Sequence, residues 1–213
     1  MTSATPCLEF FGIAKAYGSK LLFRNASASF FPGTISLLAG ANGSGKSTLL
    51  KIAAGLEQPD AGIVKRSVDQ KRIGYMAHAT FIYPAMEARE NLVFWSNAAG
   101  LPSPDQKVDE VLQKTGLTRS AHEKAGIFSR GMAQRLNLAR MLLNDPLLIL
   151  LDEPATGLDT QSRAMLGELM QDSKKRGASI LWISHSIDDD SKLADRIFSI
   201  SGKTLNEEPL PPC

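Results

Sequence analysis

The sequence predicts an α/β protein with a mostly parallel sheet at its core and a helical lobe inserted into the chain. Short apolar runs typical of buried strands alternate with helical patterns along most of the 213 residues, as expected for parallel strands joined by helices. Between about Glu87 and Leu143 the strand patterns stop and only helical patterns remain. We therefore expect a single domain over residues 1–205, with its body at 1–77 and 145–205 and its lobe at 78–144.

Strand and turn signals dominate the first part of the chain, where β-branched and apolar runs are bounded by glycine and proline. The predicted strands are Leu8–Ile13, Leu21–Phe31, Thr34–Ala39 and Ile73–Met76. Turns at Gly18 and at Pro32–Gly33 separate the first three. A helical pattern over Thr48–Ala54 is closed by Gly55, since glycine is the usual residue just past a helix end.

Helical periodicity defines the lobe, and the alternation of strands and helices then resumes. The helices predicted in the lobe are Glu90–Ala99, Asp105–Lys114 and Arg130–Leu143. The elements predicted after it are the strands Leu147–Leu151, Ser179–Ser184 and Arg196–Ile200 and the helices Gln161–Arg176 and Asp188–Ala194. The proline-containing tail at 206–213 is expected to be flexible.

Composition and charge restrict the possible partners. The chain is 43% hydrophobic and 22% charged with a net charge of +2, which is ordinary for a globular protein and argues against a nucleic-acid partner. Residues 1–6 show no secretory signal pattern. The most apolar stretch, 141–151, is interrupted by Asn144, Asp145 and Pro146, so it falls short of the about 20 residues that a membrane span requires. If the protein acts at a membrane, we therefore expect it to bind a separate membrane subunit.

A glycine-rich loop lies between the strand ending at Ala39 and the helix that follows, and it fits the P-loop pattern GxxxxGK[ST]. It comprises Gly40, Ala41, Asn42, Gly43, Ser44, Gly45, Lys46 and Ser47, followed by Thr48. Glycines let successive N–H groups turn toward an anion, and the helix adds the positive end of its dipole. Lys46 would reach the β- and γ-phosphates and Ser47 would hold Mg²⁺. The motif predicts a P-loop NTPase; the alternative is a plain glycine turn.

Two carboxylates follow the apolar run at 147–151, where the predicted strand ends. Ligands of open α/β sheets gather at the carboxyl ends of the strands. Asp152 would therefore hold Mg²⁺, and Glu153 would act as the general base on the attacking water. An acidic loop after a core strand is the alternative, and the P-loop upstream favours the functional interpretation.

With these motifs in this order, residues 8–203 resemble the ATP-binding subunits of ABC transporters. The resemblance implies a P-loop body, an antiparallel β subdomain at the N-terminus, an inserted α-helical subdomain, and hydrolysis of ATP with Mg²⁺. Tyr17 occupies the place of the aromatic that stacks on adenine, or it is a turn tyrosine packed on the edge of the body. Asp159 resembles the D-loop residue at the dimer interface, and His185 resembles the switch histidine that contacts the γ-phosphate.

Ser129, Arg130, Gly131 and Met132 occupy the place of the family's signature, which covers the γ-phosphate held by the opposite subunit. Arg130 replaces a glycine there and either adds charge or points to solvent, and Met132 replaces the usual glutamine. His78 stands where the family has glutamine, and its imidazole could sense Mg²⁺ or the attacking water. With these departures the sequence is similar to the haem exporter ATPases of cytochrome c maturation. This similarity implies that the cargo is haem.

The resemblance also implies partners and a location. It implies a head-to-tail dimer of ATPase subunits, with a second copy of this chain as the expected partner, and integral membrane subunits that place the protein at the cytoplasmic face of the cell membrane. The apolar segment Thr80–Met86 is either the docking surface for those subunits or a buried loop core. Three rivals remain: a soluble ABC ATPase acting on ribosomes or DNA, a scaffold that does not hydrolyse ATP, and a P-loop kinase.

Overall fold

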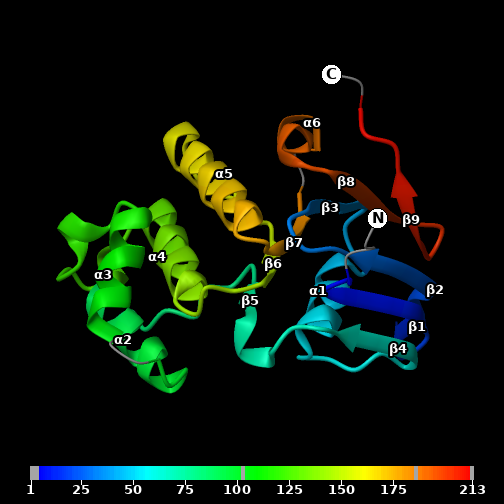
Figure 1. The fold of residues 1–213 in the computed structure, drawn as a ribbon, viewed down its shortest axis with the longest axis horizontal. Helices are drawn as coiled ribbons and strands as arrows, with labels where there is room; N and C mark the ends of the chain where they lie inside the picture. The colour runs from blue at the N-terminus through cyan, green and yellow to red at the C-terminus, as the bar shows by residue number, and fades with distance from the viewer. Residues whose placement is uncertain (1–4, 102–103, 185–186, 212–213) are drawn as a thin grey trace.

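A six-stranded sheet forms the centre of the protein, whose structure is a computed structural model describing residues 5–101, 104–184 and 187–211 (Figure 1). Its strands are β3 (Ile35–Gly40), β5 (Ile73–Met76), β6 (Leu148–Asp152), β7 (Ser179–Ile183), β8 (Arg196–Ser201) and β9 (Thr204–Glu208). They lie in the order β5-β6-β7-β3-β8-β9, and only the β8–β9 pair is antiparallel. The carboxyl ends of β3, β6 and β7 therefore meet at one edge of the sheet.

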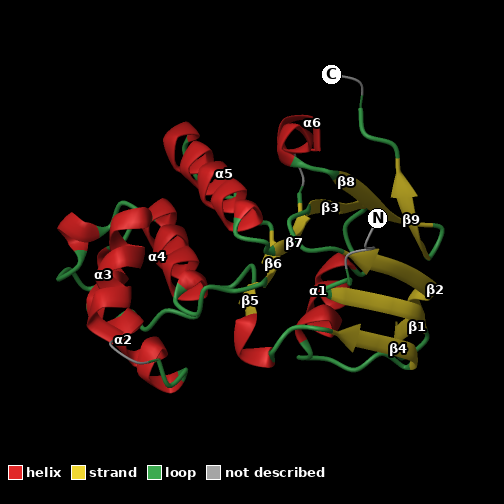
Figure 2. Cartoon of the chain, viewed as in Figure 1, coloured by secondary structure: helices red, strands yellow, loops and turns green. Residues whose placement is uncertain are grey.

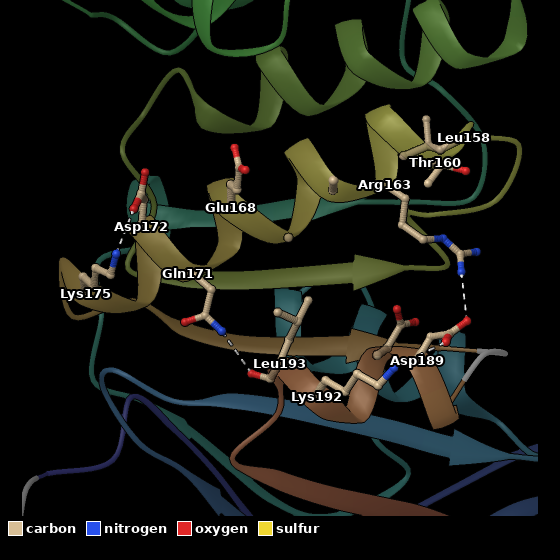
Figure 3. A pocket seen from close by; sticks show the side chains of 13 residues that line it. Leu158, Thr160, Arg163, Glu168, Gln171, Asp172, Lys175, Asp189, Lys192 and Leu193 are labelled. Carbon is tan, nitrogen blue, oxygen red and sulfur yellow. Dashed lines mark hydrogen bonds and ion pairs between the residues drawn. The ribbon is translucent and has the colours of Figure 1, made fainter. Parts of the chain in front are cut away.

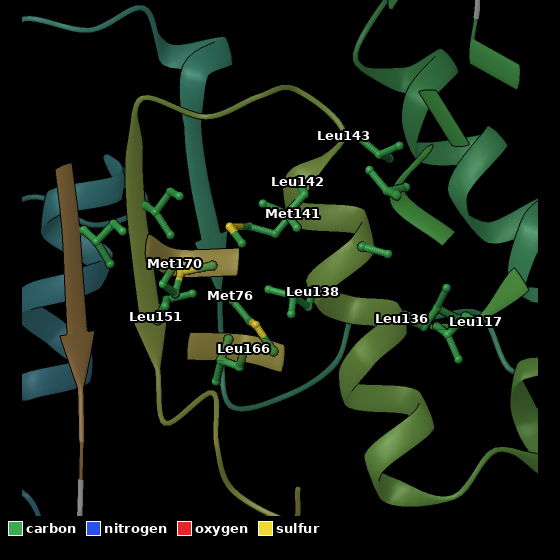
Figure 4. Packing of buried hydrophobic residues seen from close by; sticks show 14 of the residues in the cluster. Met76, Leu117, Leu136, Leu138, Met141, Leu142, Leu143, Leu151, Leu166 and Met170 are labelled. Carbon is green, nitrogen blue, oxygen red and sulfur yellow. The ribbon is translucent and has the colours of Figure 1, made fainter. Parts of the chain in front are cut away.

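The central strands are covered on both faces, which explains their uninterrupted apolar sequences. Every residue of β6 and β7 is buried. Leu148 and Leu150 face the cluster that contains helix α1 (Lys46–Ala54). Ile149 and Leu151 face the opposite cluster, in which Figure 4 shows Leu151 near side chains of helices α4 (Arg130–Leu142) and α5 (Thr160–Lys175).

A second, three-stranded antiparallel sheet packs beside α1. Its strands, in spatial order, are β2 (Lys20–Phe30), β1 (Leu8–Tyr17) and β4 (Ala61–Arg66). Phe10, Phe23 and Phe30 are fully buried and join the cluster of Leu49 and Leu50 from α1. The antiparallel N-terminal subdomain implied by the resemblance is confirmed, and Figure 2 shows this sheet and the helical lobe at opposite ends of the molecule.

The lobe is helical, as predicted. It contains α2 (Ala88–Ala98), α3 (Pro104–Lys114), α4, and the 3₁₀ turns Thr118–Ser120 and Ala125–Ile127. The remaining short elements are the 3₁₀ turns Gln70–Arg72 and Ser191–Leu193 and helix α6 (Ile187–Asp190). Over the stretches that the structure describes, no helix combines the length and the apolar character needed to cross a membrane.

Two strands differ from the sequence predictions. β4 and β9 were not predicted, and the expectation of a flexible tail from residue 206 is wrong for 206–208, which belong to β9. β9 pairs with β8 from Ile197↔Glu208 to Ser201↔Thr204, and Arg196 forms an ion pair with Glu207 at 2.6 Å. Leu205 packs against the core, whereas Asn206, Glu207 and Glu208 are exposed, so this edge strand lacks the apolar run that would have identified it.

Candidate functional site

The glycine-rich loop adopts a backbone that side chains would prevent. Gly40, Gly43 and Gly45 have φ values of 138°, 76° and 105°, all in the left-handed region that favours glycine. A Cβ atom at Gly40 would lie 2.9 Å from the carbonyl oxygen of Ile200, and one at Gly45 would lie 3.0 Å from the Phe23 ring. The loop leads into α1, whose cap residue Gly45 offers no side-chain acceptor to the first turn. Those N–H groups are therefore available to an anion.

Lys46 is held inside the loop. Its ammonium donates hydrogen bonds to the carbonyl oxygens of Gly40, at 2.7 Å, and of Ala41, at 3.1 Å, and the residue is only 6% exposed. Burial lowers the pKa of Lys46, while the nearby carboxylates of Glu153 and Asp152 oppose that shift. The lysine and the acid pair thus act on each other electrostatically, which places the two predicted halves of the site together.

Asp152 and Ser47 supply a pair of oxygen ligands suited to Mg²⁺. Burial raises the pKa of Asp152, the Ser47 hydroxyl lowers it through a hydrogen bond, and the Glu153 carboxylate raises it further. Asp152 is 4% exposed, and its Oδ1 atom has no hydrogen-bond partner within the described parts of the chain. A buried, unpaired carboxylate oxygen is costly unless it meets a cation. One carboxylate and one hydroxyl fit Mg²⁺, which takes its other ligands from water and phosphate.

Glu153 begins the turn after β6 in a strained conformation. Its φ is 54°, which is unfavourable for a residue with a side chain. The turn is fixed by hydrogen bonds from Glu153 N to Ile183 O and from Thr156 N to Glu153 O, both at 3.2 Å. The carboxylate lies 3.7 Å from Nδ1 of the exposed His78. His78, which stands where the family has glutamine, therefore lies beside the predicted base.

A hollow of about 520 Å³ unites the phosphate site with the aromatic at the end of β1. It is lined by Tyr17, Lys20, Leu22, Asn42, Gly43, Gly45, Lys46, Ser47, Thr48 and Glu153. Most of its polar groups come from the P-loop, with Lys20 of β2 and Glu153 beside them, and its aromatic group comes from β1. The hollow therefore offers a phosphate end and a ring-stacking end. Tyr17 is 50% exposed, so one part of its surface is open to a ligand, and stacking on adenine stays a prediction.

The signature residues lie away from that hollow, at the start of α4. Ser129 caps the helix, accepting a hydrogen bond from Met132 N at 3.2 Å. The Met132 side chain packs against the hydrophobic cluster of the lobe, which favours a structural role for it. Neither Ser129 nor Gly131 lines the hollow of the chain's own P-loop, and their predicted contact with a phosphate of the opposite subunit stays a prediction.

Arg130 lies over the backbone of the loop that precedes Asp159 in its own chain. A Cβ atom at Gly157 would be 2.7 Å from both Cδ and Nε of Arg130. Arg130 also lines a second hollow of about 440 Å³ together with His78 and Glu153. Neither prediction for this arginine, added charge at a phosphate or exposure to solvent, included this contact.

The two remaining predicted residues have different outcomes. Asp159 caps α5, because its carboxylate accepts a 2.7 Å hydrogen bond from Ser162 N, which lowers the pKa of Asp159. Its place at a dimer interface stays a prediction. His185 lies outside the described residues, so its predicted contact with the γ-phosphate stays a prediction too.

Gln134 is a site residue that sequence reasoning missed. It is buried on α4, and its Nε2 donates a 3.1 Å hydrogen bond to the carbonyl oxygen of Pro154, directly after Glu153. The signature helix is thereby fixed to the turn that carries the base. The signal available in the sequence was a glutamine on the mainly apolar buried face of this helix, which also contains Asn137.

A larger hollow, about 920 Å³, lies between α5 and the segment at 189–193 (Figure 3). Its charged side chains form ion pairs within the chain, such as Arg163 with Asp189 at 3.6 Å and Lys175 with Asp172 at 3.4 Å. It lacks the P-loop and the acid pair, so size alone does not make it the nucleotide site.

Comparisons of the sequence and of the fold with known proteins point to ATP-binding proteins, as the geometry of the site does. The family model described as ABC transporter matches residues 23–156. The linearmycin resistance ATP-binding protein LnrL of Bacillus subtilis (strain 168) is 35% identical over 201 residues, covering 89% of this chain. The Nod factor export ATP-binding protein I of Burkholderia orbicola (strain AU 1054) is 35% identical over 212 residues, covering 94% of this chain.

The chain spans only 65% of the length of the first relative and 70% of the second. Among solved structures, one described as the structure of an ATP binding subunit of an ABC transporter superimposes with a TM-score of 0.88 at 24% identity, covering 97% of this chain and 90% of that one. A nucleotide-free ATP-binding cassette from an ABC transporter gives a TM-score of 0.84. These two likenesses confirm the predicted fold.

Proposed function

Because the chain belongs to the ABC transporter family and is one of its ATPase domains, we propose that it hydrolyses Mg-ATP to drive transport as one half of an ATPase dimer. One observation carries the proposal: Lys46 of the P-loop and Glu153 of the strand-end acid pair line the same hollow. This is the arrangement that phosphoryl transfer to water needs, with cationic groups on the phosphates and a base beside them.

The chain's own residues account for the chemistry. The loop N–H groups and Lys46 would hold the phosphates and balance their charge. Asp152 and Ser47 would hold Mg²⁺, which neutralises the charge that develops between the β- and γ-phosphates. Glu153 would accept a proton from the attacking water as the water oxygen bonds to the γ-phosphorus and the bond from that phosphorus to the leaving ADP oxygen breaks. The fixed, strained turn at Glu153 keeps that carboxylate in place, so little reorganisation is needed at the moment of reaction.

A second chain completes the site in this proposal. Ser129 and Gly131 of one subunit would cover the nucleotide on the P-loop of the other, and Asp159 would lie at the contact between them. Closure would exclude water from the γ-phosphate side and so strengthen each electrostatic contact there. The symmetric arrangement, with two copies of this chain, is the simplest closed one.

The docking surface for membrane subunits would be the segment Thr80–Met86 with α2. Phe81 and Tyr83 of this segment are 48% and 43% exposed and Phe94 of α2 is 43% exposed, whereas Ile82 packs against the hydrophobic core. A buried loop core therefore describes Ile82 but not the two aromatic side chains of the segment. Exposed aromatic groups of this kind are typical of interfaces. Ala125 N donates to Met86 O and Gly126 N to Pro84 O, both at 2.9 Å. Movement of the docking segment would thus reach the residues just before Ser129.

The cargo is a separate part of the proposal. Haem export rests on the resemblance at His78 and the signature, whereas the relatives are named for Nod factor export and linearmycin resistance. With either cargo, we expect the chain to lie at the cytoplasmic face of the membrane, bound to integral membrane subunits. Co-purification with membrane subunits, followed by stimulation of ATPase activity by haem, by a Nod factor or by linearmycin, would choose between these cargoes.

The test of the proposal is a phosphate-release assay on matched variants. Lys46→Ala should lose ATP binding, because a buried cation with two loop contacts is removed. Glu153→Gln keeps the size of the side chain but not its basicity, so it should retain ATP binding, lower kcat by about 10²–10⁴ and accumulate an ATP-bound dimer. Glu168→Ala, on the exposed face of α5, is the control. Normal turnover in Lys46→Ala would overturn the proposal.

A further inference from the structure

A cluster of charged residues surrounds Tyr17, and none of them belongs to the P-loop or the acid pair. The Tyr17 hydroxyl donates a 2.5 Å hydrogen bond to Oε1 of Glu57. Lys15 lies 3.2 Å from the same oxygen and 3.0 Å from Oδ1 of Asp60, and it donates to the carbonyl oxygen of Gln58 at 2.9 Å. The residues Lys15, Tyr17, Glu57, Gln58 and Asp60 are called the Tyr17 bracket below.

Several contacts, some of them between largely buried side chains, hold the Tyr17 bracket together, which distinguishes it from a single ion pair on the surface. The side chains of Lys15 and Glu57 are only 12% and 19% exposed, although both lie beside the solvent-exposed Tyr17. Asp60 adds a 2.7 Å hydrogen bond from Ala16 N, and Asp60 N donates to Ala14 O at 2.9 Å. The segment 57–60 is therefore attached to the end of β1 by both backbone and side-chain contacts.

The bracket also connects Tyr17 to the P-loop helix. α1 starts at Lys46 and ends at the glycine cap Gly55, and Leu56 N donates to the carbonyl oxygen of Lys51. Glu57 follows at once. One rigid helix thus carries the phosphate-binding loop at its first residue and the partner of the Tyr17 hydroxyl two residues past its cap.

We propose that Glu57 is a positioning residue that fixes the Tyr17 ring to receive the base of ATP, an inference that rests on the proposed function. A half-exposed tyrosine with a free hydroxyl samples several rotamers, and stacking then requires one of them to be selected. The Glu57 carboxylate holds one orientation before the nucleotide arrives. The hydrogen bond to Glu57 raises the pKa of Tyr17, so the hydroxyl stays a donor throughout the physiological pH range.

Kinetics with Mg-ATP test the inference, because positioning of the base should affect binding and not the chemical step. We expect Glu57→Ala to raise KM for Mg-ATP about 3- to 10-fold, the worth of one hydrogen bond, with kcat within about twofold of the wild type. Glu57→Gln keeps the acceptor oxygen and should stay within about twofold in KM. Tyr17→Phe should match Glu57→Ala, and the double variant should be no worse than Tyr17→Phe alone.

Inorganic tripolyphosphate as a competitive inhibitor separates positioning from general damage to the fold. It carries the phosphates but no base, so its inhibition constant should be the same in the wild type, Glu57→Ala and the control Glu168→Ala. An equal loss of ATP and tripolyphosphate binding would mean that Glu57 only supports the fold, which would overturn the inference.

An unchanged KM for Mg-ATP in Glu57→Ala, with Lys46→Ala inactive, would overturn the inference and leave the proposed function intact. A wild-type protein that does not hydrolyse ATP would overturn the proposed function itself.

Discussion

The backbone at Glu153 should make glycine a more stable residue than alanine at this position. Both substitutions remove the carboxylate and its contacts, so their difference reports the backbone alone. A left-handed φ costs a residue with a Cβ about 1–2 kcal/mol. Glycine in turn costs about 0.5–1 kcal/mol of folding stability relative to alanine, because it loses more backbone entropy when the chain folds. At φ 54° the balance favours Glu153→Gly over Glu153→Ala by about 0.5–1 kcal/mol, which reverses the usual order.

Thermal and urea unfolding measure this difference. For a chain of this size we expect Tm of Glu153→Gly to lie about 1–4 °C above that of Glu153→Ala. Lys203, at φ 64° in the β8–β9 turn, is a matched strained position far from the chemistry and should show the same order. Glu168, in the middle of α5, should show the usual order, with alanine more stable. If alanine equals or exceeds glycine at 153, the turn holds no strain and the argument for a pre-positioned base loses its support.

Three further predictions concern the same site. Asp152→Asn should stabilise the nucleotide-free protein relative to the wild type, and this gain should grow as pH rises from 4 to 7.5. Burial raises the pKa of Asp152, so the folded wild-type protein loses stability as that carboxyl ionises. Urea unfolding at several pH values measures the stability difference, and a difference that stays constant with pH would contradict the prediction. His78→Ala should lower kcat for ATP hydrolysis, because it removes the imidazole whose Nδ1 lies 3.7 Å from the Glu153 carboxylate; a kcat equal to that of the wild type in a phosphate-release assay would exclude a role for His78. Gly157→Ala should cost about 1–2 kcal/mol through its φ of 79° and more through the clash with Arg130, and Arg130→Ala in the same chain should recover only the second part; denaturant unfolding of the single and double variants tests this.

Local sequence was enough to predict the P-loop and the acid pair. The glycine pattern, the apolar strand before it and the helix after it lie within 20 residues, and the left-handed φ values of Gly43 and Gly45 are what the motif requires. Likewise, the unbroken apolar run at 147–151 indicated a buried strand, and β6 is buried at every residue.

Features that depend on distant segments could not be predicted in this way. β4 is a strand because Phe11↔Ile63 and Leu8↔Arg66 pair across the sheet, although Ile63 is 60% exposed and Gly62 weakens the strand pattern. The Tyr17–Glu57 bond joins residues 40 apart. Arg130 meets Gly157 only because α4 and the turn after β6 lie together, which no local pattern indicates.

Glu153 belongs to two hollows, and this position bears on how hydrolysis would depend on docking. One hollow contains the P-loop, and the other contains His78 and Arg130 of the same chain. The docking segment begins two residues after His78, and through Pro84 and Gly126 it is also hydrogen-bonded to the residues that precede Ser129. In the proposed dimer, a single movement of this segment would shift His78 against the base of its own chain and Ser129 against the nucleotide of the other. Both ATP sites would then respond to one docking event, since each depends on elements that the same segment contacts.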